Sequence, residues 1–177
     1  LCSLGNGFDI DIPAFTRPLL VGGGIGTAPL YLLARRLKER GVSPTVILGF
    51  NTASEIIYEK EFKALGLRTL VTTVDGSYGT PGFVTAALPL LAFVSDPSSV
   101  ADPSTVGACG YDYCYACGPM PMLRALAPKL ATPAQFSLEE RMGCGTGICM
   151  GCTCPQLTGT KRICKDGPVF RLDEISF

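Results

Sequence analysis

The stretch RPLLVGGGIGTAPLYLLARRLKER, residues 17–40, decides the class of fold. Its first five residues form a short apolar run typical of a buried strand, and a cluster of glycines ends that run. From residue 28 to residue 40, apolar side chains return every three or four positions with charged side chains between them, which predicts an amphipathic helix. A strand, a glycine turn and a helix in this order are typical of an α/β nucleotide-binding unit.

The same alternation continues along the chain. Further buried strands are predicted at 45–50, 67–74, 111–117 and 135–139, and further helices at about 54–64, 83–93 and 120–130. Strands that alternate with helices through short connections indicate a parallel sheet covered on both faces. We therefore expect an α/β fold, with a doubly wound parallel five-stranded sheet over residues 17–142 and a small cysteine-rich appendage over residues 143–177.

Residues 1–16 read as loop and begin with Leu, so we expect them to be a linker from a domain that precedes this chain. With 47% hydrophobic and 17% charged residues among 177, the chain has the composition of an ordered domain. Its 15 basic and 15 acidic residues argue against a nucleic-acid partner, and the absence of His excludes imidazole chemistry. The longest apolar stretch, 81–94, is shorter than the ~20 residues of a membrane span, so we expect a soluble, cytoplasmic protein.

The nine cysteines are clustered rather than spread as a disulfide framework would be. Three of them have the spacing C-x4-C-x2-C and a fourth follows eleven intervening residues later, which is typical of two-iron clusters of the plant type. The glycines between them allow backbone N–H groups to approach the sulfurs. The candidate ligands are Cys144, Cys149, Cys152 and Cys164.

A structural zinc site with four cysteines is the alternative to an iron–sulfur cluster. Zinc sites of that kind usually pair two C-x2-C units, and only one such unit is present here, which favours iron. Cys154 is a second open point, because it could replace Cys152 or Cys164 as a ligand or be a small buried residue. The longer spacing favours Cys152.

The glycine turn is a candidate site for the pyrophosphate of a dinucleotide, which would lie against the N-terminus of the following helix. The turn reads GGGIGTAP and departs from G-x-G-x-x-G, so glycines needed only for packing remain an alternative. No Arg or Lys stands in residues 51–58 to bind a 2′-phosphate, which favours NADH over NADPH.

The fourth predicted strand ends in Cys117-Gly118-Pro119, at the edge of the sheet where ligands of open α/β folds bind. The thiol could lie beside a nicotinamide ring, or it could be a buried cysteine before a Gly-Pro turn. The residues alone leave both interpretations open.

Taken together, the segments GNGF, VGGGIGTAPLY, LGF, DGSYGTPG, YACGPMPML, CGTGICMGC and RICKDGPVF resemble the electron-transfer subunits of class 1B dihydroorotate dehydrogenases. These belong to the ferredoxin-NADP reductase superfamily. The resemblance covers essentially all 177 residues, and its most specific parts are the cysteine loop and residues 164–170. It implies an NAD(H)-binding domain, a 2Fe-2S cluster on the four cysteines named above, and FAD held mainly by an N-terminal barrel that would precede Leu1.

The resemblance also implies roles for individual residues in binding the nicotinamide cofactor. None of them is a catalytic acid or base, since hydride and electrons pass between cofactors. Those expected at the pyrophosphate are Gly22, Gly23, Gly24, Gly26 and Thr27. Those expected at the cleft or bordering the nicotinamide are Asp75, Gly76, Cys117, Gly118 and Pro119.

The function implied is electron transfer in pyrimidine biosynthesis. Electrons from dihydroorotate would leave FMN on a catalytic partner subunit, in a heterotetramer, and pass through the cluster and FAD to NAD⁺. The partner is expected to dock around the cysteine loop, where Ile148 and Met150 are apolar. The alternatives are a subunit of an NADH-dependent ferredoxin:NADP oxidoreductase or of a sulfide dehydrogenase, and a non-redox, zinc-stapled nucleotide-binding module.

Overall fold

A computed structural model describes residues 5–11, 17–91 and 110–177. Its central feature is a seven-stranded sheet in which every neighbouring pair is parallel except the last, where β9 runs antiparallel to β6. The strand order is β4-β3-β2-β1-β5-β6-β9. The strands are β1 (Pro18–Gly23), β2 (Thr45–Phe50), β3 (Thr69–Thr73), β4 (Thr80–Pro81), β5 (Tyr113–Cys117), β6 (Ala134–Ser137) and β9 (Val169–Arg171).

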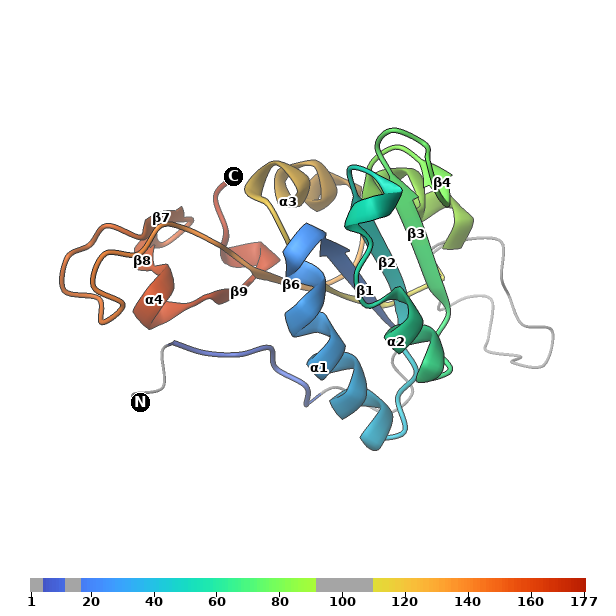
Figure 1. Cartoon of the computed structure of the whole chain (residues 1–177). Helices are drawn as coiled ribbons and strands as arrows, with labels where there is room; N and C mark the ends of the chain where they lie inside the picture. Colours follow the sequence, from blue (N-terminus) through green and yellow to red (C-terminus); the bar gives the residue numbers. More distant parts are fainter. Residues whose placement is uncertain (1–4, 12–16, 92–109) are drawn as a thin grey trace.

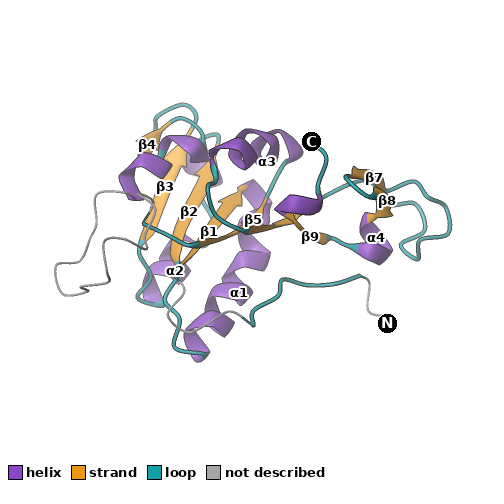
Figure 2. Ribbon diagram, turned by 180° about the vertical axis from the view of Figure 1, so that it is seen from behind, coloured by secondary structure: helices purple, strands orange, loops and turns teal. Residues whose placement is uncertain are grey.

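Helices cover both faces of this sheet (Figure 1). Helices α1 (Thr27–Glu39) and α2 (Glu59–Ala64) lie on one face. Helix α3 (Met120–Leu126) and two 3-10 turns, Val84–Ala86 and Leu88–Leu91, lie on the other, which Figure 2 shows from behind. The doubly wound α/β fold expected from the sequence is therefore confirmed.

Two apolar cores result, one on each face. In β1 all six residues are buried: Leu20 packs with Leu30 and the other apolar residues of α1, whereas Leu19 and Val21 pack on the side of α3. A parallel strand buried on both faces needs apolar residues at successive positions, which is why residues 17–21 read as a continuous run.

All five predicted strands are present, but β4 and β9 were not predicted. β4 has only two residues, and β9 has three and falls in the segment expected to be a cysteine-rich appendage. Such short segments have no periodicity of their own, and they become strands because a neighbouring edge offers its hydrogen bonds.

Helix α1 agrees with its prediction to within one residue, but the other predicted helices are longer than the observed ones. The helix expected at 54–64 begins only at Glu59, because Ile56 is extended and Tyr58 adopts a left-handed conformation with φ 63°. The helix expected at 120–130 ends at Leu126, and a 3-10 turn that contains Pro128 follows, since proline cannot donate the next helical hydrogen bond. In place of the helix expected at 83–93 there are the two 3-10 turns, and residues 92 and 93 lie outside the described residues, as do Cys2 and Cys109.

The cysteine-rich appendage consists of an antiparallel hairpin, β7 (Thr153–Gln156) and β8 (Gly159–Arg162), followed by the short helix α4 (Ile163–Asp166). The chain then returns to the main sheet as β9. Cys152, Cys164 and Phe170 belong to the same apolar core as Leu123 of α3, so the appendage and the sheet are packed together. Within the described ranges, no helix is long and apolar enough to cross a membrane.

The N-terminal segment lies along β9 and β5. Asn6 donates from Nδ2 to Val169 O (3.0 Å) and accepts from Val169 N at Oδ1 (3.1 Å). Phe8 packs edge-on against Tyr115, with ring centroids 5.5 Å apart. These contacts join residues more than 100 positions apart in the sequence.

Candidate metal centre and nucleotide cleft

The four candidate ligands lie in two pairs. In the loop before β7, Cys149 N donates to Cys144 Sγ at 3.4 Å, and both residues are exposed. Where the hairpin meets α4, Cys164 N donates to Cys152 Sγ at 3.4 Å, and both residues are buried. The structure therefore places the four thiols in two pairs, one within the loop and one that spans the hairpin.

Backbone N–H groups of the loop point at the sulfurs. Cys144 Sγ also accepts from Thr146 N, and Cys149 Sγ accepts from Gly151 N, each at 3.4 Å. These bonds need a tightly turned backbone, and Gly147 has a φ of +83°. The hydrogen bonds from Cys149 and Thr146 lower the pKa of Cys144 to about 5, and the N–H of Cys164 lowers that of Cys152. The pKa of Cys164 is raised, because its side chain is hydrogen-bonded to Cys152.

This donor set fits an iron–sulfur cluster. Thiolates are the form that binds iron, and N–H donors around the sulfurs offset their negative charge. Over residues 5–11, 17–91 and 110–177, no three Cys, Asp or Glu side chains converge closely enough to hold a single metal ion. A structural zinc site needs four donors around one point, whereas a two-iron cluster takes two thiolates on each iron. Two pairs of thiols correspond to the two thiolates that each iron of such a cluster takes.

Cys154 lies apart from this arrangement of loop hydrogen bonds. It is buried on β7 in the apolar core, where Gln156 Nε2 donates to its sulfur at 3.3 Å. This setting favours its interpretation as a small buried residue.

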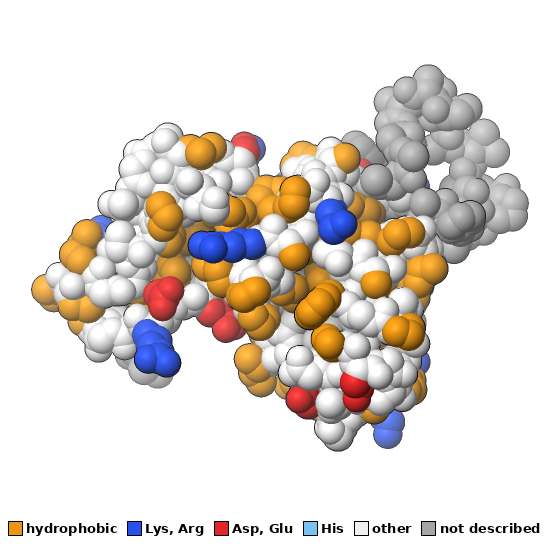
Figure 3. Space-filling view, turned by 90° about the horizontal axis from the view of Figure 1, so that it is seen from above, with side chains coloured by type: hydrophobic (Ala, Val, Ile, Leu, Met, Phe, Trp, Pro, Cys, Tyr) orange, Lys and Arg blue, Asp and Glu red, His pale blue; other side chains and the backbone are white. Residues whose placement is uncertain are grey.

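A cavity of about 370 Å³ lies at the carboxyl ends of β1, β2 and β3. This is the edge that Figure 3 shows from above, where hydrophobic side chains are spread over the surface. The cavity walls are largely apolar, with the carboxylate of Glu55 as their charged group. Three of the ten residues expected at the nicotinamide cofactor line it: Gly23, Gly24 and Pro119.

Most glycines of the turn have a packing role. A Cβ on Gly26 would lie 2.4 Å from Cys117 O, and a Cβ on Gly22 would lie 2.8 Å from Thr27 Cγ2. Gly24 differs, because it has a φ of +54° and open space beside it. The turn after β1 therefore touches the turn after β5, and the strand order reverses at this point of the sheet, which is where open α/β folds bind ligands.

The thiol of Cys117 is buried, and burial raises its pKa to about 11. It therefore stays protonated near neutral pH and is unsuited to act as a nucleophile. Asp75 forms a turn with Gly76 and Ser77: its carboxylate accepts from Ser77 N (3.0 Å) and Oγ (2.6 Å), which lowers the pKa of Asp75.

Sequence reasoning missed the apolar wall of the cleft. Phe83, Val74 and Met122 line the cavity, and Phe83 is 67% exposed. A large exposed aromatic next to a cavity is informative in a structure, but in the sequence these residues look like ordinary core positions.

A doubly wound domain with a cleft at the switch point, joined to a segment with two pairs of thiols, defines the class of ferredoxin reductase-like proteins with an iron–sulfur segment. Residues 139–176 match the iron-sulfur cluster binding domain of dihydroorotate dehydrogenase B. The chain is 48% identical, over 97% of its length, to the electron transfer subunit of dihydroorotate dehydrogenase B (NAD(+)) from Bacillus caldolyticus, and 44% identical to that of Listeria monocytogenes serotype 4a.

The chain is thus a homologue of these electron transfer subunits, which confirms the resemblance seen in its motifs. It spans 62% of the length of the Bacillus caldolyticus protein and 63% of the Listeria protein. A solved structure of an NADH-dependent reduced ferredoxin-NADP oxidoreductase is also similar, with 35% identity and a TM-score of 0.78. That similarity covers 99% of this chain and 59% of the other.

Proposed function

We propose that this chain carries electrons between a 2Fe-2S cluster and a nicotinamide as part of the electron transfer subunit of an NAD-dependent dihydroorotate dehydrogenase. Residues 17–142 form the nicotinamide-binding part and residues 143–177 the cluster-binding part. The observation that supports this most directly is the two-by-two arrangement of thiols inside the segment that matches the iron–sulfur domain family.

The cluster would supply a centre that accepts and releases single electrons. We assign Cys144 and Cys149 to one iron, and Cys152 and Cys164 to the other. The backbone N–H groups that point at these sulfurs would stabilise the negative charge of the loaded site. The buried pair would anchor the cluster to the core, and the exposed pair would leave it near the surface.

The cleft would hold NAD(H), with its pyrophosphate near Gly24 and its nicotinamide bordered by Cys117, Gly118 and Pro119. Gly22, Gly26 and Thr27 would support the turn, and Asp75 and Gly76 the rim of the cleft. Glu55 Oε2 accepts from Asn51 N (3.1 Å) and Nδ2 (3.0 Å), which leaves its other oxygen to accept from a ribose hydroxyl. A carboxylate at this place repels a 2′-phosphate, which supports a preference for NADH.

A flavin must act between nicotinamide and cluster, because nicotinamide exchanges a hydride and the cluster exchanges single electrons. We assign FAD mainly to the part of the longer relatives that this chain does not match. No side chain of this chain is required as an acid or base in that transfer.

The electron donor would be a catalytic subunit that carries FMN, docked on the cysteine loop. Ile148 is 83% exposed, Met150 51% and Met142 47%, and all three are within two positions of the exposed Cys144 or Cys149 in the sequence. In Figure 3 hydrophobic side chains lie at the end of the molecule farthest from the grey atoms, on the left of the view. Exposed apolar side chains of this kind fit a stable protein interface, and docking there would place the cluster close to the partner.

The second candidate is a subunit of an NADH-dependent ferredoxin:NADP oxidoreductase, favoured by the structural similarity over 99% of the chain. Mixing the chain, together with FAD and a flavin-binding domain from a longer relative, with an FMN-containing dihydroorotate dehydrogenase distinguishes the two. Reduction of NAD⁺ by dihydroorotate supports the first function, and its absence with a cluster-loaded chain favours the second.

The basic test of the site is the visible spectrum of anaerobically purified chain, with iron, sulfide and zinc analysis. We expect a brown protein with about two iron and two sulfide per chain, as for a two-iron cluster held by cysteine thiolates. A colourless protein with stoichiometric zinc would refute the electron-transfer function.

A further inference from the structure

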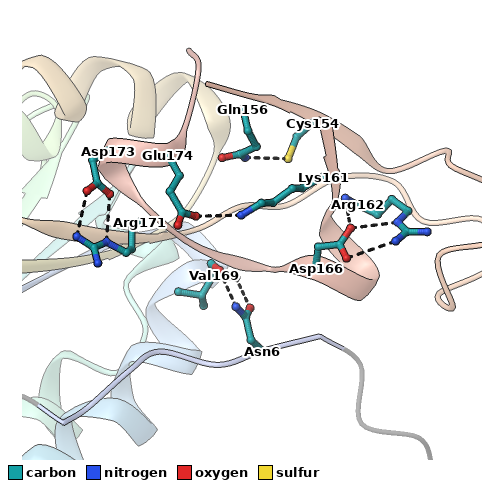
Figure 4. Close-up of polar contacts among 10 residues, drawn as sticks. All are labelled: Asn6, Cys154, Gln156, Lys161, Arg162, Asp166, Val169, Arg171, Asp173 and Glu174. Carbon is teal, nitrogen blue, oxygen red and sulfur yellow. Dashed lines mark hydrogen bonds and ion pairs between the residues drawn. The ribbon is translucent and has the colours of Figure 1, made fainter. Parts of the chain in front are cut away.

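Arg162 connects three parts of the appendage. It ends β8, and its NH1 group donates to Gly147 O in the cysteine loop at 3.0 Å. Its Nε donates to Asp166 Oδ2 of α4 at 3.0 Å, as Figure 4 shows, and its backbone N donates to the same oxygen at 2.9 Å. The guanidinium therefore has a fixed position relative to both the loop and the helix.

That position is next to the buried pair of thiols. Arg162 lies opposite Thr153 in the hairpin, one residue after Cys152, and Ile163 N donates to Cys152 O at 3.1 Å. The hydrogen bond with Asp166 raises the pKa of Arg162, and negative charge on Cys164 and Cys152 raises it further. The guanidinium therefore lies between the cysteine loop and the part of the hairpin that carries the buried thiols.

Arg162 also acts through the loop. The carbonyl that it binds belongs to Gly147, which lies between Cys144 and Cys149 in the loop. A Cβ on Gly147 would lie 2.9 Å from Cδ and 3.0 Å from Cβ of Lys165, so the loop is packed closely against α4 here. Arg162 therefore fixes the loop between Cys144 and Cys149 at Gly147.

We propose that Arg162 and Asp166 together set the reduction potential of the cluster, as a charge pair whose positive member is bound to the cysteine loop. This inference rests on the proposed function, because it needs the cluster to be bound. On reduction the cluster gains one electron and becomes more negative, so a nearby positive charge favours the reduced form. Asp166 partly neutralises that charge and therefore has the opposite effect.

The two members of the pair thus predict shifts of opposite sign. Arg162→Gln removes the positive charge and lowers the potential, and Asp166→Asn leaves Arg162 without its counter-charge and raises the potential. We expect each to change the ratio of reduced to oxidised cluster about tenfold at a given solution potential, which for one electron is 59 mV. Arg162→Lys keeps the charge and should shift the potential less than Arg162→Gln does.

A purely structural role would not produce this pattern, because loosening the same contact from either side would disturb the loop in the same way. The matched controls are Arg171→Gln and Asp173→Asn. Arg171 forms a similar pair with Asp173, at 3.1 and 3.0 Å, but the groups that act on its pKa are Asp173 first, then Tyr113 and Glu174, and no cysteine is among them.

The experiment is a redox titration of the cluster-loaded full chain with dithionite and soluble mediators, followed by visible absorbance, with iron content and thermal unfolding of each variant measured in parallel. Opposite shifts for Arg162→Gln and Asp166→Asn, with the controls unchanged, would support the proposal. Shifts in the same direction, or shifts no larger than those of the controls, would overturn it while leaving the proposed function intact.

If Arg162→Gln does not retain a cluster, Asp166→Asn and Arg162→Lys decide: an unchanged or lowered potential in Asp166→Asn overturns the proposal. Failure of the unmodified chain to bind iron and sulfide would instead overturn the proposed function, and this inference with it.

Discussion

Replacing Gly26 by Ala tests whether the turn after β1 is held against the turn after β5. The added Cβ would lie 2.4 Å from Cys117 O, 2.6 Å from Cys117 C and 2.8 Å from Gly118 N. All three atoms belong to the backbone, so a change of rotamer cannot relieve the contact. Either the turn after β1 or the turn after β5 has to move.

The cost of such overpacking is typically about 1–3 kcal/mol. Because the contact is with backbone on both sides, we expect a value near the upper end of that range. For a chain of this size, a cost of about 3 kcal/mol corresponds to a decrease in Tm of about 6–12 °C. NADH binding should weaken as well, since Pro119, the next residue after Gly118, lines the cleft.

Thermal unfolding of the cluster-free chain, followed by circular dichroism, measures the first effect, and titration with NADH measures the second. Gly7→Ala is the matched control, because a Cβ there would meet nothing within 4 Å and its φ is not positive. The control should change stability by less than about 0.5 kcal/mol. If Gly26→Ala were as stable as Gly7→Ala, the close approach of the two turns would be wrong.

Four further predictions concern the two sites. Cys154→Ser should keep the cluster. A Ser at any of the four assigned ligands should abolish or gravely destabilise the cluster, because a hydroxyl binds iron poorly; these ligands are Cys144, Cys149, Cys152 and Cys164. A chain that stays brown after one of these four substitutions would disprove the assignment. The chain should bind NADH more tightly than NADPH, and Glu55→Gln should weaken NADH about tenfold in a nucleotide titration while leaving NADPH nearly unchanged; equal losses for both would argue against contact with the ribose. The Cys117 thiol has a pKa of about 11, so at pH 8 it should react slowly with iodoacetamide, whereas Cys144 of the cluster-free chain, with a pKa of about 5, should react quickly. Mass spectrometry of the labelled peptides measures both rates. Comparable rates would contradict the burial of Cys117. NADH alone should bleach the cluster of this chain very slowly, and stopped-flow absorbance that showed rapid bleaching without added flavin would refute the need for FAD.

The class of fold and the candidate metal site follow from local patterns. Five strands were predicted because a strand buried on both faces requires consecutive apolar residues, and each of these runs ends at residues that interrupt it, such as Gly22. The cysteine loop was predicted because C-x4-C-x2-C brings three thiols together within a few residues, whatever the rest of the chain does. Both signals are short-range, so a single sequence contains them.

Other features depend on residues that are distant in the sequence. The three residues of β9 become a strand only because the edge of β6 is open beside them, and Asn6 reaches Val169 only after the sheet has formed. The sequence shows several glycines in the turn after β1, but only the structure shows that they have different roles. Gly24 faces open space, whereas at Gly26 the backbone of Cys117 leaves no room for a side chain.

The sequence by itself therefore determined five strands of the main sheet, the four candidate ligands and the family resemblance. The tertiary structure decided how those ligands pair, which apolar side chains line the cleft, and that Arg162 links Gly147 of the cysteine loop to Asp166. The physical reason is that periodicity and spacing report contacts within a few residues along the chain. Pairing across a hairpin, closure of a cleft and the position of a charge beside a sulfur arise only when separate elements pack against one another.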